Sequence, residues 1–248
     1  MKFATGAALF CAGVGALLVA SAPAVLLDTA LDRASAGRFR LALAEGTLWN
    51  GQGRFASADS NGSPSAITRL GWRLDPSALL GARLRWRLEI DGSAPATLEI
   101  GLGGVALQRL SVQLPPAAAL AVVPHALARA GWRGMLDLRV PALACGWGGR
   151  CEGTLQVEWR AGGVDILPGQ ALGDHRIVAA IATPATTLEI TALRGLALAV
   201  NGKVELASGR RPRVDLDIGG DAALLGRLRG MLDELGAVQH GARLRIRS

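Results

Sequence analysis

The sequence predicts a mainly β protein, in which a single N-terminal transmembrane helix precedes an antiparallel, curved β-sheet domain with one or two short helices. Three observations lead to this fold class. One apolar stretch without any charged residue opens the chain. Beyond it, charged and bulky apolar residues alternate with a period of two, which is typical of half-buried strands. Gly, Pro, Asn and Ser separate these alternating stretches, as expected for a succession of short strands and turns.

The N-terminal apolar run extends from Phe3 to Leu27 and follows Lys2. About twenty apolar residues are enough to cross a bilayer as a helix. Ala22-Pro23-Ala24 could instead be the small-x-small cleavage site of a signal peptide, although the apolar run is long for a signal sequence. We favour an uncleaved signal-anchor over residues 1–27. Lys2 then stays in the cytoplasm and residues 28–248 are exported to the periplasm, on the outer side of a bacterial inner membrane.

The alternation is clearest from Arg83 to Ile90, where it places Leu84, Trp86 and Leu88 on one face of a strand and charged residues on the other. The same pattern predicts strands at residues 38–44, 67–74, 97–102, 135–140, 154–159, 177–182, 186–190, 203–206, 214–218 and 243–247.

Two stretches depart from this alternation. From Asp221 to Leu235, leucines and one methionine recur every three or four residues, Asp221 is placed as an N-cap, and Gly236 follows the last turn. This pattern predicts a helix. Residues 116–130 are Ala-rich and could hold a shorter helix interrupted by Pro124. We expect one exported domain, whose two halves could meet near residues 115–131.

The basic character of the chain does not indicate nucleic-acid binding. The net charge is +7, but the basic residues are spread evenly and nearly all are Arg. A nucleic-acid binder would concentrate them on one face. We therefore expect no nucleic acid, whereas weak attraction to anionic lipid or to an acidic partner stays open. Separately, we expect no small-molecule substrate.

The chain has three cysteines. Cys11 lies inside the apolar run, and Cys145 and Cys151 enclose a Gly-rich connector between two predicted strands. In an oxidising compartment this arrangement indicates a disulfide that pins a hairpin turn. Free thiols are the alternative. Zinc is disfavoured, because a structural site needs four ligands and the three histidines are scattered.

No catalytic or cofactor-binding residue is predicted. Asp174 and His175 are an adjacent acid and imidazole, but no Ser lies in a nucleophile-elbow motif. The pair Gly101 and Gly103 does not open a helix after a strand, so it forms no phosphate-binding loop. We expect Asp174 and His175 to lie in a solvated turn.

Arginines and tryptophans form the candidate binding surfaces. One arginine row comprises Arg83, Arg85 and Arg87, and a second comprises Arg243, Arg245 and Arg247. Such rows protect an exposed sheet edge from aggregation, or they dock an acidic partner. The tryptophans in or beside predicted strands either pack in the core or anchor a partner. They are Trp49, Trp72, Trp86, Trp132 and Trp159.

Several phrases of the sequence resemble the type II secretion system protein N family. They are an anchor ending in Ala22-Pro23-Ala24-Val25-Leu26-Leu27, the phrase Gly46-Thr47-Leu48-Trp49-Asn50-Gly51, and the phrase Trp72-Arg73-Leu74-Asp75-Pro76-Ser77-Ala78-Leu79-Leu80. Residues 153–159 and Leu172-Gly173-Asp174-His175-Arg176 are also similar, with His175 where the family typically has Tyr.

The resemblance implies a non-enzymatic accessory protein of the type II secretion system. Such a protein assists the export of folded periplasmic proteins across the outer membrane and contacts other subunits of the machine. The rival hypothesis is a membrane-anchored lipid-binding or lipid-transfer domain, because alternating apolar faces with few helices to cover them could hold acyl chains.

Overall fold

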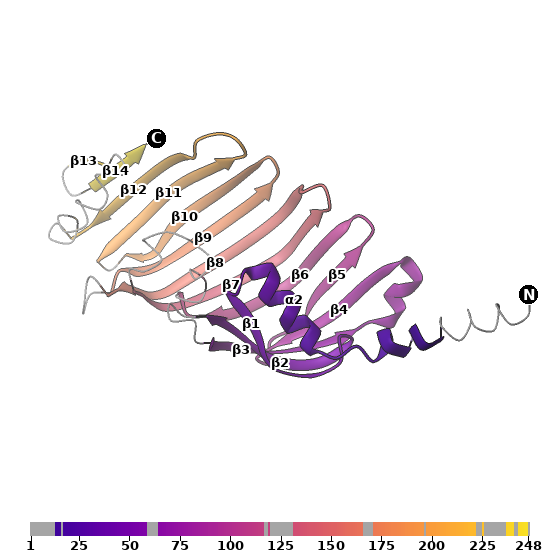
Figure 1. Cartoon of the computed structure of the whole chain (residues 1–248). Helices are drawn as coiled ribbons and strands as arrows, with labels where there is room; N and C mark the ends of the chain where they lie inside the picture. The colour runs from indigo at the N-terminus through magenta and orange to yellow at the C-terminus, as the bar shows by residue number, and fades with distance from the viewer. Residues whose placement is uncertain are drawn as a thin grey trace, which may run out of the picture. The chain divides into compact units, whose positions relative to one another are not determined.

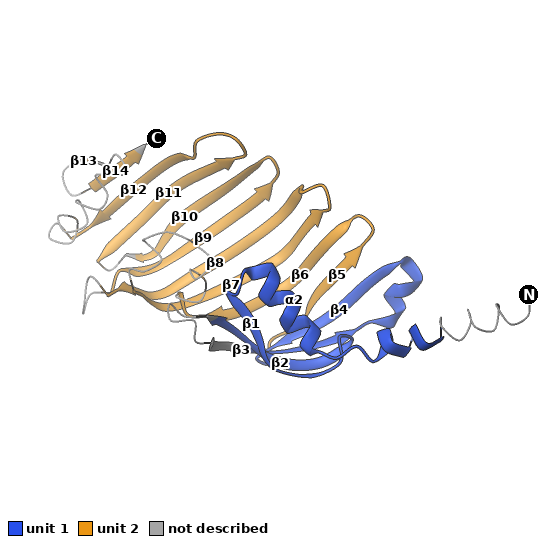
Figure 2. Ribbon diagram, in the orientation of Figure 1, with its two compact units in different colours: residues 1–92 blue, residues 93–248 orange. Residues whose placement is uncertain are grey.

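The structure is a computed structural model, and it describes residues 13–15, 17–58, 64–116, 119, 131–165, 171–195, 197–221, 225, 237–240 and 243–247. It confirms a mainly β protein built from antiparallel strands with few short helices (Figure 1). The chain divides into two compact units, residues 1–92 and residues 93–248 (Figure 2). The predicted meeting point of two halves near residues 115–131 falls mostly outside the described residues and stays a prediction.

In unit 1, residues 1–92, the described residues form four antiparallel strands that pair in sequence order. Its elements are α2 (Val25–Ser35), β1 (Phe39–Gly46), β2 (Asn50–Ala58), β3 (Pro64–Leu74), the 3₁₀ helix η1 (Pro76–Gly81) and β4 (Arg83–Ile90).

Unit 2, residues 93–248, continues with antiparallel pairing of sequence neighbours until β12, which pairs with β14, and β14 pairs with β13. Its strands are β5 (Ala96–Gly101), β6 (Gly104–Leu114), β7 (Trp132–Gly146), β8 (Cys151–Val164), β9 (Gly173–Ala182), β10 (Ala185–Gly195), β11 (Leu198–Ala207), β12 (Arg213–Gly220), β13 (Ala237–His240) and β14 (Arg243–Arg247).

The strand register gives the sheet of unit 2 one apolar and one polar face. Leu155, Ala179, Leu188, Val204 and Val214 are successive cross-strand partners from β8 to β12. Neighbours along a strand point to opposite faces, so the next row across the same strands is polar. That row runs through Gln156, Glu189, Lys203, Asp215 and Arg247, with Val178 of β9 as its apolar member.

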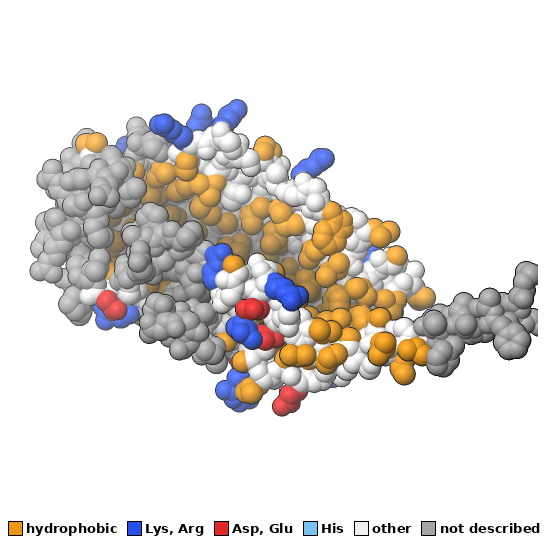
Figure 3. Space-filling view, in the orientation of Figure 1, with side chains coloured by type: hydrophobic (Ala, Val, Ile, Leu, Met, Phe, Trp, Pro, Cys, Tyr) orange, Lys and Arg blue, Asp and Glu red, His pale blue; other side chains and the backbone are white. Residues whose placement is uncertain are grey.

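Part of the apolar face is closed by a core cluster. Leu225 and Leu244 are 2% and 1% exposed, and they pack with Ile218, Leu198 and Val164. In the apolar row from Leu155 to Val214, most side chains are only half-buried. Figure 3 shows hydrophobic side chains gathered on the face that it presents.

The predicted strands are largely confirmed, and β4 and β14 have the predicted bounds. The sequence missed β2, β6 and β13. β2 is rich in Gly and Ala, and β1 and β3 pair with it on both sides, so its neighbours determine its conformation. In β6 the alternation is interrupted at Arg109, whose φ of +57° departs from extended backbone.

The helices differ from the expectation. α2 was not predicted, and it begins at Val25, inside the predicted anchor. Of the helix expected from Asp221 to Leu235, the described residues include only Asp221 and Leu225, and the Asp221 carbonyl accepts the Leu225 N–H. The helix expected within residues 116–130 lies almost entirely outside the described residues. Among the described residues, the structure contains no helix of the length and apolarity that spanning a membrane requires.

Candidate functional site

The end of the apolar N-terminal segment is hydrogen-bonded to the turn between β1 and β2. The Ala24 N–H donates to the Gly46 carbonyl at 3.1 Å, and the Leu48 N–H donates to the Ala22 carbonyl at 2.8 Å. Pro23 forms an isolated antiparallel bridge with Thr47 between these two bonds. We call these paired segments, residues 22–24 and 46–49, the N-terminal joint. The joint brings together two phrases of the sequence that resemble the same family.

Three tryptophans support the N-terminal joint. The indole N–H of Trp72 donates to the Thr47 carbonyl at 2.9 Å, and that of Trp86 donates to the Leu48 carbonyl at 3.3 Å. Trp49 stacks on Trp86 with ring centroids 6.4 Å apart and planes within 4°. Trp72 and Trp86 are 5% and 9% exposed, so they pack in the core of unit 1 and satisfy their polar atoms on this turn.

Glycine is required on both sides of this turn. Gly46 has a φ of +91°, which L-residues with a side chain rarely adopt. A Cβ at Gly51 would lie 2.6 Å from Cζ2 of Trp72 and would also collide with the Glu45 carbonyl oxygen. The Gly-Thr-Leu-Trp-Asn-Gly phrase therefore has a local explanation: the glycines allow the turn and the close approach of Trp72.

α2 packs against the edge strand β1 through two polar side chains. The Asp28 carboxylate accepts two hydrogen bonds from the Arg40 guanidinium, at 2.9 and 2.7 Å, and one from the Leu41 N–H at 2.7 Å. The hydrogen bond from Arg40 is the main cause that lowers the pKa of Asp28. Ser35 Oγ accepts the Phe39 N–H at 2.9 Å. These bonds occupy backbone donors on β1 that an edge strand would otherwise leave unpaired.

The phrase after Trp72 forms a short, pinned connection between β3 and β4. The Leu74 N–H donates to the Trp49 carbonyl at 2.6 Å, and the Asp75 N–H donates to the Arg85 carbonyl at 2.7 Å. Asp75 then caps η1, because its Oδ1 accepts the N–H and the hydroxyl of Ser77. These bonds from Ser77 are the main causes that lower the pKa of Asp75.

The two predicted arginine rows lie in different units, and each forms ion pairs within its own unit. In the first row, Arg87 and Arg85 approach the Asp75 carboxylate at 3.5 and 4.0 Å. Arg83 is exposed at the start of β4. The local carboxylate offsets part of the positive charge of this row.

In the second row, Arg245 pairs with Asp215 at 3.5 Å and Arg243 pairs with Asp217 at 3.7 Å. Both arginines are exposed, whereas the side chain of Arg247 lies outside the described residues. The pairing partners are on β12, the strand next to β14. A partner surface at either row stays a prediction.

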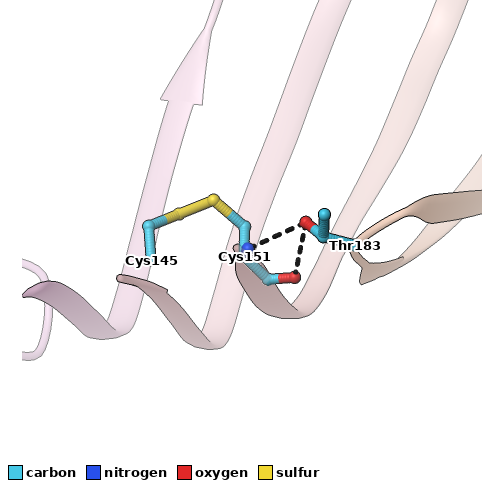
Figure 4. Close-up of a disulfide and its surroundings, with 3 residues drawn as sticks. All are labelled: Cys145, Cys151 and Thr183. Carbon is cyan, nitrogen blue, oxygen red and sulfur yellow. Dashed lines mark hydrogen bonds between the residues drawn. A yellow bond between two sulfur atoms is a disulfide. The ribbon is translucent and has the colours of Figure 1, made fainter. Parts of the chain in front are cut away.

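The predicted bond between Cys145 and Cys151 is present in the structure (Figure 4). The two cysteines are cross-strand partners at the β7–β8 hairpin, with Cα atoms 4.0 Å apart. Thr183 braces the same hairpin end: its hydroxyl accepts the Cys151 N–H at 2.8 Å, and its own N–H donates to the Cys151 carbonyl at 3.0 Å. The disulfide therefore closes a hairpin end that is also hydrogen-bonded to the connection between β9 and β10.

Asp174 and His175 lie in β9, not in a solvated turn, so that expectation was wrong. As strand neighbours they project to opposite faces. His175 is 4% exposed, contacts the Trp159 ring with centroids 5.9 Å apart, and accepts the Val200 N–H at Nε2 over 3.3 Å. Asp174 accepts the Ala161 N–H at 2.8 Å. Burial lowers the pKa of His175, and nearby Asp174 opposes this effect.

Unit 1 also carries an open depression of about 630 Å³ on its sheet. Its lining includes Glu45, Arg54, Arg69 and Glu89, and Gly71 leaves space between the charged side chains. Within the part of the chain that the structure describes, no three His, Cys, Asp or Glu residues are grouped to hold a metal.

In the sequence, the residues of the N-terminal joint stood out only because they belong to two phrases that resemble the family. The sequence did not connect Val19, Ala22 and Ala24 with residues 46–49. Trp72 and Trp86 were the signal that could have located this turn, because a buried indole N–H needs a hydrogen-bond acceptor and a turn between strands offers free carbonyls.

A model of the family described as "Type II secretion system (T2SS), protein N" matches residues 38–247. Neither a curated protein nor a solved structure matches the chain.

Proposed function

The chain belongs to the type II secretion system protein N family, and from this membership we propose that it is a non-enzymatic accessory subunit of that secretion machine. It assists the export of folded periplasmic proteins across the outer membrane by contacting other subunits. Of the predicted anchor at residues 3–27, the part before the N-terminal joint crosses the bacterial inner membrane as a single span, and the chain from the joint onward lies in the periplasm.

The family match over residues 38–247 carries the secretion role, and the N-terminal joint supports the membrane anchor. The joint ties the end of the uncharged apolar run to three strands of unit 1 through bonds to Gly46, Thr47 and Leu48. An apolar segment that only directs export and is then removed has no need of such a connection. The Cys145–Cys151 disulfide supports a periplasmic site, because disulfides persist in that compartment.

The decisive experiment is a deletion of the gene in its host. Extracellular and periplasmic levels of a known secreted enzyme are compared, and outer-membrane integrity is measured alongside. Accumulation of that enzyme in the periplasm with an intact outer membrane supports the secretion role. Normal secretion in the deletion strain contradicts it.

The arginine rows give a residue-level test of partner contact. Arg243 and Arg245 are exposed, and their ion pairs contribute at most about 1 kcal/mol each. Reversal of both charges also places two glutamates beside Asp215 and Asp217, so thermal unfolding of the variant is measured first to show that it folds. We expect the Arg243→Glu/Arg245→Glu variant to lower secretion if this row docks an acidic subunit. Arg150→Glu, in the exposed β7–β8 turn, is the matched control. Equal secretion by both variants contradicts a partner surface on β14.

A second function is favoured by the half-buried apolar row of unit 2. Leu155, Leu188, Val204 and Val214 present apolar surface on one face of the sheet, and acyl chains are the ligand with matching chemistry. Purified full-length protein in a mild detergent would then retain co-purifying lipid, measured by mass spectrometry after extraction. A deletion strain with normal secretion but altered outer-membrane lipid would favour this function over the first.

A further inference from the structure

The tip of the connection between β3 and β4 exposes two leucines. In η1, Ala78 is buried at 7% exposure, whereas Leu79 and Leu80 are 50% and 96% exposed. A 3₁₀ helix has three residues per turn, so an inward Ala78 leaves the next two residues on the outside. Two adjacent exposed leucines at the tip of a turn form an apolar surface that is available for contact with a partner or a membrane.

The turn holds this apolar surface in a fixed position. Asp75 caps its start through Ser77, and Ala82, in the left-handed region at φ +51°, ends it with an N–H bond to the Leu79 carbonyl. The chain on either side is joined by the bond from the Asp75 N–H to the Arg85 carbonyl. The leucines are therefore displayed by a braced turn.

The apolar N-terminal segment leaves unit 1 at the same end. Trp49 contacts both segments: its carbonyl accepts the N–H of Leu74, two residues before η1, and its indole N–H donates to the Val19 carbonyl at 2.8 Å. Leu17, Leu18 and Val19 are 69%, 66% and 59% exposed. In Figure 1 the N-terminal segment leaves unit 1 at the end that carries the connection between β3 and β4.

We propose that Leu79 and Leu80 insert into the periplasmic leaflet of the membrane that the N-terminal segment crosses, so that unit 1 contacts the bilayer at two points. This inference rests on the proposed membrane anchor. Trp49 is hydrogen-bonded to both segments, to Leu74 just before η1 and to Val19 among the exposed apolar residues 17–19. Tryptophans are enriched at the boundary between lipid and water, which is where this proposal puts Trp49. Two attachment points also hold a membrane protein more firmly than one.

The test uses single cysteines in the full-length protein, in a Cys11→Ser background with the Cys145–Cys151 disulfide intact. Leu80→Cys, Val14→Cys and Leu43→Cys are each labelled with an environment-sensitive fluorophore and reconstituted into vesicles of phosphatidylethanolamine and phosphatidylglycerol. Leu43 is the matched control, because it is a 70% exposed leucine of unit 1 that lines the depression beside Asp91 and Gly92. Asp91 and Gly92 follow the end of β4 that is farther from η1. At the rise per residue of a β-strand, the length of β4 separates them from η1 by about 25 Å.

The expected result is that the Leu80 label shifts to the blue and is quenched by spin-labelled lipid, whereas the Leu43 label is quenched by aqueous iodide. The Val14 label reports the anchor. A Val14 label in lipid with a Leu80 label in water overturns this inference and leaves the proposed function standing. A Val14 label in water overturns the anchor and the inference with it. Leu80 and Leu43 labels that are both in lipid also overturn it, since contact would not be confined to the tip.

Discussion

The indole N–H of Trp49 donates a hydrogen bond to the carbonyl oxygen of Val19, 2.8 Å away and thirty residues earlier in the chain. Val19 lies three residues before Ala22, the first residue of the N-terminal joint, and it belongs to the helical turn that leads into Ala22. Trp49 is therefore the side chain that connects the apolar N-terminal segment to the turn between β1 and β2. The bond can be tested without removing the ring stacking on Trp86.

Trp49→Phe keeps an aromatic ring but removes the N–H donor. We expect it to lower the free energy of unfolding of unit 1 by about 1 kcal/mol, the usual net value of one hydrogen bond. Amide exchange of residues 17–24 should also become faster. Trp147→Phe is the control, because Trp147 makes a similar bond to the Gly101 carbonyl at 3.1 Å but is 63% exposed in a turn of unit 2. Equal exchange at residues 17–24 in both variants would contradict the role of Trp49.

Gly51→Ala should destabilise the protein, because the new methyl group would collide with the Trp72 ring and the Glu45 carbonyl oxygen. Overpacking of this kind costs about 1–3 kcal/mol. Urea denaturation followed by tryptophan fluorescence measures the loss. Gly81→Ala is the matched control in the same unit: a Cβ at Gly81 would meet nothing within 4 Å, so we expect a change within about 0.5 kcal/mol. If Gly51→Ala left the free energy of unfolding unchanged, the steric explanation of this glycine would be wrong.

Asp28→Asn removes the charge that accepts the Arg40 and Leu41 hydrogen bonds. We expect a loss of about 1 kcal/mol at neutral pH. The pKa of Asp28 is lowered by folding, so its contribution is fully present above the ordinary value of 3.8 and is lost as the pH falls through the lowered value. Thermal unfolding of wild type and variant should therefore converge in acid. Asp32→Asn is the control, because Asp32 approaches Arg40 only at 3.9 Å. It should change little at any pH.

His175 should make the stability of unit 2 sensitive to mild acid. Burial lowers its pKa below the ordinary value of 6.5, so between these two values the unfolded chain binds a proton that the folded chain does not. The free energy of unfolding is thus highest above about pH 6.5 and decreases as the pH falls toward the lowered pKa. His175→Gln keeps a hydrogen-bond acceptor for the Val200 N–H without titrating. Between pH 7 and pH 5, the free energy of unfolding should fall less for the variant than for the wild type. An equal fall in both proteins would contradict this assignment.

The Cys145→Ala/Cys151→Ala variant should lose about 2 kcal/mol of stability, the value expected from loop entropy for so short a closed loop. Unfolding by urea of the full-length protein in detergent measures it, with and without reductant. Reductant should lower the stability of the wild type and leave the variant unchanged. The control Cys11→Ser keeps the disulfide and should respond to reductant like the wild type. A wild type that is insensitive to reductant would show that the bond does not form.

The local pattern of the sequence determined which segments become two-faced strands. The alternation from Arg83 to Ile90 predicted the bounds of β4, and its buried side chains are the predicted ones, because period-two burial is a property of the strand itself. The Gly-rich connector between Cys145 and Cys151 likewise predicted the hairpin and its disulfide. The family resemblance followed from the order of short phrases, and the family match over residues 38–247 confirms it.

Only the tertiary structure decided which of these phrases touch. Ala22 and Ala24 bond to Leu48 and Gly46, and Trp49 reaches back to Val19, across separations that no local period records. β2, with its Gly and Ala residues, is a strand because β1 and β3 supply its hydrogen bonds. His175 looked like part of a polar pair and is a core residue of β9, because pairing with β8 places it against Trp159. The sequence determines the chemistry of each side chain. Strand pairing between distant segments determines which group a buried donor or ring contacts.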